Sequence, residues 1–389
     1  MLKRWKLGLS VACSCAVLLA ACGGGGGDGA GSGTVPTPTL ARLNDTGVSA
    51  DQCFAAGSKT LMACSSPQAR ALSTTQDGQL GRDAVAGTNS STDGKLGFQF
   101  SAVAGGCVRD EVTGLVWESK TADGGLRDNT RAYTNYGDGR SGDASEFVSA
   151  VNLAGLCGAA DWRLPTFAEL GGLVDYGAMA AGSRPWIDTT WLPNTPAAHY
   201  STSDLITPIF GVNSRVRWVQ FNPRGFFIQP GDRSESYGVR LVRGGNALVP
   251  TATRFTPSPD AQEVTDGQTG LVWRRCAEGT TFAAGSCTGT ITILSHEQAL
   301  SLASARAAST GAGWRLPNAK ELASLAQPSG GSPARALVAF PSTPTGYLSS
   351  VWAATPCSTG AAAYAGTDFA VHCLARGLGA AAQLVRDPS

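Results

Sequence analysis

The stretch D-W-R-L-P-T-F-A-E-L at Asp161 to Leu170 returns later in the chain as G-W-R-L-P-N-A-K-E-L at Gly313 to Leu322. In both copies proline forces the leucine before it into an extended conformation. Thr166 with Glu169, and Asn318 with Glu321, then have the spacing of a capping box, which begins a helix. Each copy therefore predicts an extended corner that leads into a helix.

A second motif precedes the first in both copies, because T-G-L-V-W occurs at Thr113 to Trp117 and again at Thr269 to Trp273. Turn-prone polar residues come before each Leu-Val-Trp, which favours a hairpin with the tryptophan in the core. Two motifs repeated in one order predict two tandem domains of one fold. We place these domains at residues 107–245 and 260–387, joined by a linker at residues 246–259.

The remaining pattern predicts an α+β fold with two helices and several short antiparallel strands per domain. Phe147 and Val151 indicate an earlier helix in the first copy, and Ser295 with Gln298 begins one in the second. The repeated arginine and glutamate of the W-R-L-P stretch are expected to form an internal ion pair beside a buried tryptophan. The structural residues of the two motifs are Trp117, Trp162, Arg163, Glu169, Trp273, Trp314, Arg315 and Glu321.

Together these motifs resemble the Lcl C-terminal domain family, which is named after a bacterial collagen-like surface adhesin. The resemblance covers both halves and implies two loop-rich domains similar to C-type lectins, preceded by a leader segment with one cysteine pair at residues 40–106. A calcium-dependent lectin would carry further sequence motifs. The stretch of this chain most similar to one of them is Gln229 to Asp232, which does not match it. We therefore expect no metal and no cofactor.

The N-terminus has the pattern of a lipoprotein signal at residues 1–21. Three basic residues precede a short apolar run, and Leu19-Ala20-Ala21-Cys22 resembles a lipobox, in which the cysteine is acylated after cleavage. Residues 22–39, rich in glycine and proline, then form a tether. We expect lipidation at Cys22, a lipid anchor in the membrane and a location in the cell envelope, at the outer membrane.

Eight cysteines remain after the signal and the lipobox. An even number in an exported protein favours disulfides, although eight cysteines allow 105 connectivities. Spacing suggests local pairs. A zinc site would need CxxC pairs or clustered histidines, and the sequence has neither. The expected pairs are Cys53 with Cys64, Cys107 with Cys157, Cys276 with Cys287, and Cys357 with Cys373.

Composition excludes several classes of function. The chain has 30 basic and 29 acidic residues, so its charge gives no general attraction for nucleic acid. It has only three histidines, far apart in sequence, which argues against a histidine-based metalloenzyme or triad hydrolase.

One segment of the first domain, between Asn213 and Gly245, is rich in arginine and is therefore locally basic. Aromatic residues lie between these arginines in the sequence. Guanidinium groups suit sulfate, phosphate or carboxylate, while aromatic rings stack on sugars. The alternative is that strand alternation places the aromatic side chains in the core and the arginines in solvent or in ion pairs. The candidate ligand-binding residues are Arg215, Arg217, Trp218, Arg224 and Arg233.

The sequence thus predicts a non-enzymatic binding or adhesion lipoprotein, with anionic glycans as one candidate ligand. An envelope structural protein that binds another protein is the alternative. An enzyme related to the lectin-like oxidases that modify sulfatases is a weaker one, because that chemistry needs a reactive cysteine or a metal.

Overall fold

The computed structural model describes residues 43–81, 97–196, 198–206, 215–221, 231–245, 251–325, 339–341, 350–358, 360–365 and 371–388. All of them belong to one unit, Leu40–Ser389. Cys22 and the tether lie outside the described residues. Below, the first repeat is residues 107–245, the second repeat is residues 260–387, and the leader segment is residues 40–106.

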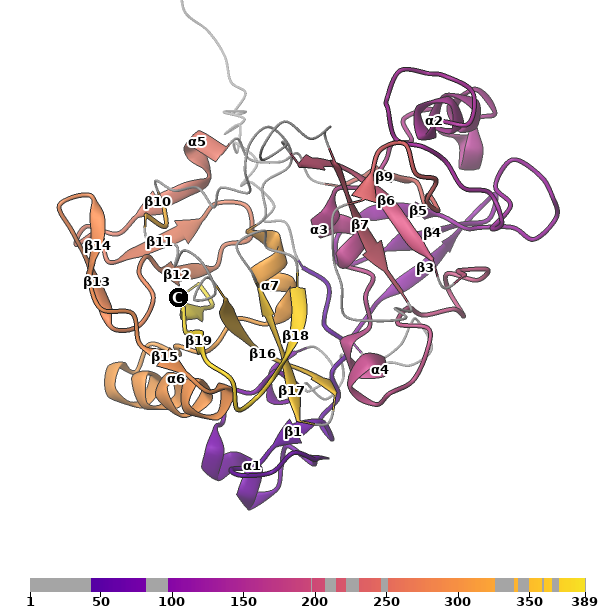
Figure 1. Ribbon diagram of the computed structural model, residues 1–389. Coiled ribbons are helices and arrows are strands. Elements are labelled where there is room, and N and C mark those ends of the chain that lie inside the picture. The colour runs from indigo at the N-terminus through magenta and orange to yellow at the C-terminus, as the bar shows by residue number, and fades with distance from the viewer. Residues whose placement is uncertain are drawn as a thin grey trace, which may run out of the picture. The chain divides into compact units, whose positions relative to one another are not determined.

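A four-stranded antiparallel sheet joins the beginning of each repeat to its end (Figure 1). The tryptophan of T-G-L-V-W lies on an inner strand, where Trp117 pairs with Val242 and Trp273 pairs with Val385. Both indoles are fully buried, as predicted. The sheet orders are β3-β4-β5-β9, made of Phe100–Val103, Cys107–Asp110, Leu115–Glu118 and Val242–Gly244, and β10-β11-β12-β20, made of Phe255–Pro257, Glu263–Asp266, Val272–Arg274 and Val385–Arg386.

The outer strands β3 and β10 lie before residue 107 and before residue 260, outside the predicted domains. Strand β10 is part of the predicted linker, where helix α5 (Thr251–Arg254) precedes it. Pro257 is compatible with a strand here because β10 is at the edge of the sheet, where a missing N–H leaves no ladder bond unmade.

A second sheet in each repeat contains the strands that follow the W-R-L-P stretch, and in the second repeat β15, which precedes that stretch, joins it. In the first repeat its order is β6-β7-β8, with β6 at His199–Ile206, β7 at Arg215–Gln220 and β8 at Gly231–Asp232. In the second repeat the order is β15-β19-β16-β17-β18, antiparallel except for the β16–β19 pair. These strands are Ile293–Leu294, Ala380–Ala381, Val351–Ser358, Ala361–Ala365 and Val371–Ala375, and a separate hairpin pairs β13 (Thr280–Ala283) with β14 (Ser286–Gly289).

Three helices begin where the sequence predicts. Capping boxes start α3 (Phe167–Gly171), α6 (His296–Thr310) and α7 (Ala319–Ser324). Asp143 caps α2 (Ala144–Leu153), and Asp175 caps α4 (Tyr176–Ala180) through a bond from Ala178 N to its carboxylate. A 3-10 turn, η2 (Leu156–Gly158), follows α2. The described residues thus form a mixed α+β fold.

The leader segment packs against both repeats rather than standing apart from them. Apart from β3, its elements are β1 (Cys53–Phe54), β2 (Leu61–Met62), α1 (Pro67–Leu72) and the 3-10 turn η1 (Asp77–Gln79). The Gln52 amide donates to Gly177 O in the first repeat, and Arg376 of the second repeat donates to Ser58 O. The leader therefore forms part of the folded unit.

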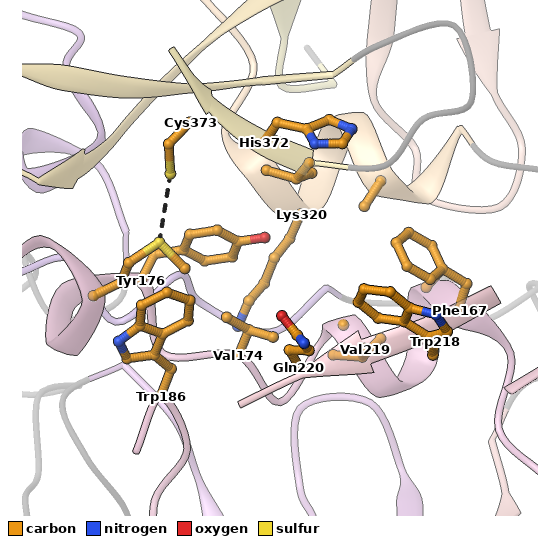
Figure 2. A pocket seen from close by; sticks show the side chains of 15 residues that line it. Phe167, Val174, Tyr176, Trp186, Trp218, Val219, Gln220, Lys320, His372 and Cys373 are labelled. Carbon is orange, nitrogen blue, oxygen red and sulfur yellow. Dashed lines mark hydrogen bonds between the residues drawn. The ribbon is translucent and has the colours of Figure 1, made fainter. Parts of the chain in front are cut away.

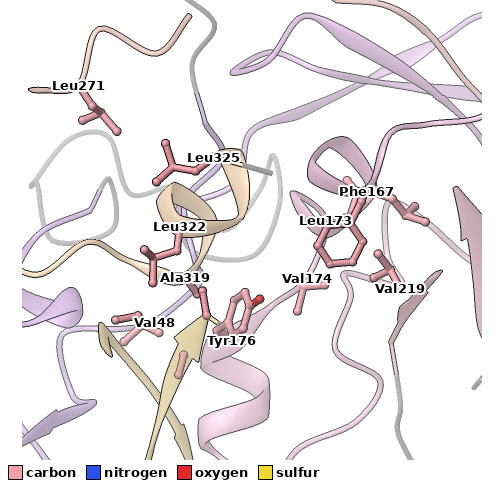
Figure 3. Close-up of a cluster of buried hydrophobic side chains, with 14 of the residues drawn as sticks. Val48, Phe167, Leu173, Val174, Tyr176, Val219, Leu271, Ala319, Leu322 and Leu325 are labelled. Atoms are coloured by element: carbon pink, nitrogen blue, oxygen red, sulfur yellow. The ribbon is translucent and has the colours of Figure 1, made fainter. Parts of the chain in front are cut away.

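The largest core cluster runs through both repeats, and α3 and α7 contact each other within it. Phe167 and Leu173 from the first repeat belong to the same cluster as Ala319, Leu322 and Leu325 from the second (Figure 3). The repeats therefore share apolar surface through equivalent helices.

The four predicted disulfides are confirmed. Cys53–Cys64, Cys276–Cys287 and Cys357–Cys373 close short loops, and Cys107–Cys157 closes a loop with a sequence separation of 50. Disulfides of this number are typical of proteins outside the reducing cytoplasm.

Candidate ligand pocket between the repeats

The two W-R-L-P corners fix the positions of α3 and α7. Arg163 exchanges both main-chain hydrogen bonds with Val242, and Arg315 does the same with Val385, so each corner is tied to the last strand of its repeat. Each arginine then forms a bidentate ion pair with the glutamate of the capping box. The nitrogen–oxygen distances are 2.8 and 2.7 Å for Arg163 with Glu169 and 2.7 Å twice for Arg315 with Glu321.

The ion pair with Arg163 keeps Glu169 negatively charged. Burial by itself would raise the pKa of Glu169, but the hydrogen bonds and charge of Arg163 outweigh it, so this pKa lies below its ordinary value. The glutamate is therefore ionised near neutral pH, as the predicted pair requires.

A cavity of about 100 Å³ lies where α3 and α7 meet. Figure 2 shows Trp186 and Val174 on one side of it and Trp218 and Phe167 on the other. The second repeat closes the remaining side with α7 and with β18, which carries Cys373. We call this cavity the inter-repeat pocket.

The polar groups of the inter-repeat pocket are few and are mostly engaged. Lys320 on α7 is 4% exposed, and its ammonium group donates to the carbonyl oxygens of Asp45 and Gly172. Burial lowers the pKa of Lys320 to about 7, although nearby carboxylates oppose this shift. Gln220 contacts His199, whose ring lies 4.0 Å from that of Trp218, centroid to centroid.

The comparisons with known proteins agree with the repeated motifs. The sequence model of the Lcl C-terminal domain matches residues 106–243 and 262–386. The chain belongs to this family. No curated protein and no solved structure matches it. The two repeats are accordingly called the first and second Lcl domains below.

The structure does not gather the arginine-aromatic residues of the first Lcl domain into one exposed face. Arg217 is 7% and Trp218 is 6% exposed, on β7, and the Arg217 guanidinium lies over the Phe167 ring. Arg233 donates to the main-chain oxygen of Asn135. Arg215 begins β7, and Arg224 lies outside the described residues.

The physical reason is that β7 is the central strand of its sheet. It has β6 and β8 on either side, α3 packs against it, and Val216, Trp218 and Tyr237 form a separate cluster. Helix α3 covers one face of β7 and the cluster covers the other, so strand alternation does not bring Arg217 or Trp218 to the surface. This corrects the expectation of an exposed cationic and aromatic surface at Arg217 and Trp218.

Two further arginines of the same segment have structural partners. Arg240 is fully buried and donates to Glu118 O and to Thr195 Oγ1, both at 2.6 Å. Arg243 pairs with Asp161 at 2.6 Å, a pair that the second Lcl domain lacks because Gly313 replaces the aspartate. The alternative prediction, aromatic side chains in the core and arginines in ion pairs, describes part of this segment better.

The sequence did not indicate the pocket residues Trp186 and Tyr176, because the pocket forms only when the two domains meet. One signal was present. Lys320 occupies the position of Ala168 in the repeated stretch, on a helix that is otherwise buried. A lysine at such a position needs partners from outside its own domain.

Among the described residues, no three histidine, cysteine, aspartate or glutamate side chains lie together as a metal site would require. Within the same residues, no helix is long and apolar enough to cross a membrane.

Proposed function

We propose that this protein is a non-enzymatic binding lipoprotein of the cell envelope, and that its ligand site is the inter-repeat pocket. The basic N-terminus, the lipobox at Leu19 to Cys22 and the glycine-rich tether support the anchor. The four disulfides support an oxidising compartment. They also engage all eight cysteines after the lipobox, which disfavours a thiol-dependent oxidase.

The observation that carries the proposal is a pocket whose aromatic walls come from the first Lcl domain and which the second Lcl domain closes. Ligand sites often lie between domains and are lined by aromatic side chains with a few polar groups. Here Phe167, Trp186 and Trp218 supply the aromatic surface. Because Lys320 already donates to two carbonyl oxygens, the pocket suits a compact apolar group better than an anion.

A compact apolar ligand differs from the anionic glycan that the sequence indicated as a candidate. A glycan site would draw on Arg215, Arg217, Arg224 and Arg233, but Arg217 is buried and Arg233 donates to main-chain oxygens. The likeness to C-type lectins remains an expectation from the family resemblance and favours ligand binding in general. Retention of the protein on heparin at low salt would favour the glycan instead.

A fluorescence titration with 1-naphthylamine, a compact dye that is uncharged at neutral pH, tests the pocket in the full-length mature protein. A Cβ added to Gly171, which lines the pocket, would meet no atom within 4 Å, so the pocket wall has room for a side chain to begin in the Gly171→Leu variant. Gly377→Leu is the matched control, because Gly377 is exposed and its Cβ would also meet nothing. We expect Gly171→Leu to weaken binding about tenfold or more, and Gly377→Leu to leave it unchanged.

Thermal unfolding of the two variants shows whether both remain folded. Equal dye binding by wild type and by a folded Gly171→Leu variant would overturn the assignment of the pocket. The anchor is tested separately, because Cys22→Ser should move the protein from the membrane fraction to the supernatant. A Cys22→Ser variant that stays in the membrane fraction would contradict the lipoprotein proposal.

A further inference from the structure

Two polar groups of the inter-repeat pocket are left without a partner by the fold. Among the described residues, none forms a hydrogen bond with the hydroxyl of Tyr176 or with Oε1 of Gln220. Tyr176 is only 7% exposed, yet neither oxygen is sealed in the protein interior. Figure 2 shows both oxygens pointing into the space between Trp186 and Trp218. Both are therefore open to a ligand in the pocket.

The other polar side chains of the pocket have partners within the protein. The amide nitrogen of Gln220 contacts the His199 ring. Burial lowers the pKa of His199, so this ring is neutral near pH 7 and can accept from the amide. The Lys320 ammonium donates to two main-chain oxygens, and the His372 ring stacks on that of Tyr364 with 5.4 Å between centroids. Lys320, the charged side chain of the described wall, is thus engaged.

The size and the walls of the pocket suit a single ring. Its volume is about 100 Å³, and an apolar cavity of about 150 Å³ holds benzene. The rings of Phe167, Trp186 and Trp218 favour an aromatic ligand, because aromatic pairs gain from stacked or edge-on contact. A hydroxyl on that ring both donates and accepts, so one such group can serve both open oxygens.

We propose that the inter-repeat pocket binds a small neutral phenol, whose hydroxyl donates to Oε1 of Gln220 and accepts from the hydroxyl of Tyr176. An ammonium ligand would find no carboxylate in the described wall, and an anion would find Lys320 already engaged. A hydrocarbon would remove water from both oxygens without replacing its hydrogen bonds, which costs free energy. The inference rests on the proposed function, because it takes this pocket as the ligand site.

Displacement of bound 1-naphthylamine from the mature protein at about pH 7 tests the proposal. Phenol and toluene have nearly the same shape and differ in a hydroxyl against a methyl group. We expect wild type to bind phenol more tightly, although toluene is the more hydrophobic. Tyr176→Phe and Gln220→Met should each shift the ratio of the two dissociation constants about five- to tenfold toward toluene.

Tyr133→Phe is the matched control, because Tyr133 is a buried tyrosine of the same domain that lies in another core cluster. It should keep the wild-type ratio, and thermal unfolding shows whether all three variants are folded. Tyr176→Phe removes no hydrogen bond between described residues, so we expect it to fold as wild type does.

The possible results separate this inference from the proposed function. Failure of the dye to bind, or dye binding that Gly171→Leu does not weaken, overturns the pocket itself and the phenol with it. Normal dye binding with toluene preferred by wild type, or with the wild-type ratio kept by Tyr176→Phe and Gln220→Met, overturns the phenol alone. Stronger displacement by N-acetyltyrosinamide than by phenol would overturn the small molecule in favour of a tyrosine side chain of another protein.

Discussion

The hydroxyl of Thr355 donates a hydrogen bond of 2.5 Å to the carboxylate of Asp77, and the same hydroxyl accepts one of 2.9 Å from Ala319 N. In the first Lcl domain the equivalent amide, Phe167 N, donates directly to Asp204 at 3.2 Å. The leader thus supplies to the second domain a carboxylate that the first domain carries on its own strand. Both carboxylates lie at the start of the helix that follows W-R-L-P.

These two carboxylates should make stability depend on pH. Burial raises the pKa of Asp77 to about 7 and that of Asp204 to about 6. Both values exceed the unfolded one of about 3.9. The stability that each group contributes is therefore complete below about pH 4 and is lost as the pH rises toward its folded pKa.

We expect Asp77→Asn and Asp204→Asn each to remove part of this loss, so that each variant gains on the order of 2–4 kcal/mol relative to wild type between about pH 4 and pH 8. Urea unfolding across that range measures it. If the free energies of unfolding of variant and wild type changed with pH by the same amount, the buried carboxylates would not cause the pH dependence.

The contribution of Lys320 to stability should change with pH in the opposite direction, and at higher pH. Burial lowers its pKa to about 7, against about 10.4 in the unfolded chain. Its contribution to stability is therefore present above about pH 10 and is lost as the pH falls toward 7. Lys320→Met removes this loss, but leaves the carbonyl oxygens of Asp45 and Gly172 without their donor.

We expect Lys320→Met to be less stable than wild type by about 1–3 kcal/mol at about pH 10, with a deficit that shrinks toward pH 7. Denaturant unfolding at several pH values measures it, with Lys59→Met, an exposed lysine of the leader, as control. A deficit that stays constant with pH would contradict a buried, titrating amine.

The sequence was a good guide wherever structure depends on neighbours along the chain. The capping boxes at Thr166 and Asn318, the corner prolines and the arginine-glutamate pairs were all predictable, because each is set by spacings of a few residues. Cysteine spacing similarly indicated the four disulfides, three of which close short loops.

Features that depend on contacts between distant segments could not be predicted. No local pattern shows that Asp77 of the leader meets Thr355, or that Trp186 and Lys320 line one pocket. Nor does alternation reveal that β7 is covered on both faces, which is why Arg217 is buried. The first depends on docking of the leader on the second domain, the second on packing of the two Lcl domains, and the third on packing of α3 against β7 within the first domain.

The repeated ion pairs share one bidentate arginine–glutamate contact but differ in burial, and Arg315 also pairs with Asp387 at 3.0 Å. The side chain of Arg163 is 42% exposed, whereas that of Arg315 is 10% exposed. Breaking a buried pair leaves an uncompensated charge, while an exposed one is partly solvated. We expect Glu321→Gln to lower the free energy of unfolding by about 3 kcal/mol and Glu169→Gln by about 1 kcal/mol. Equal losses in urea unfolding would contradict the role of burial.

Disulfide removal should cost more for the longer loop. Cys107–Cys157 has a sequence separation of 50, against 11 for Cys53–Cys64. In the chain-entropy account, a longer cross-linked loop restricts the unfolded chain more, which gives about 4 kcal/mol for the first bond and about 3 kcal/mol for the second. Double alanine variants of each pair, compared by thermal unfolding, measure the difference. A larger loss for the Cys53 pair would mean that docking of the leader on both domains, rather than loop entropy, dominates its contribution.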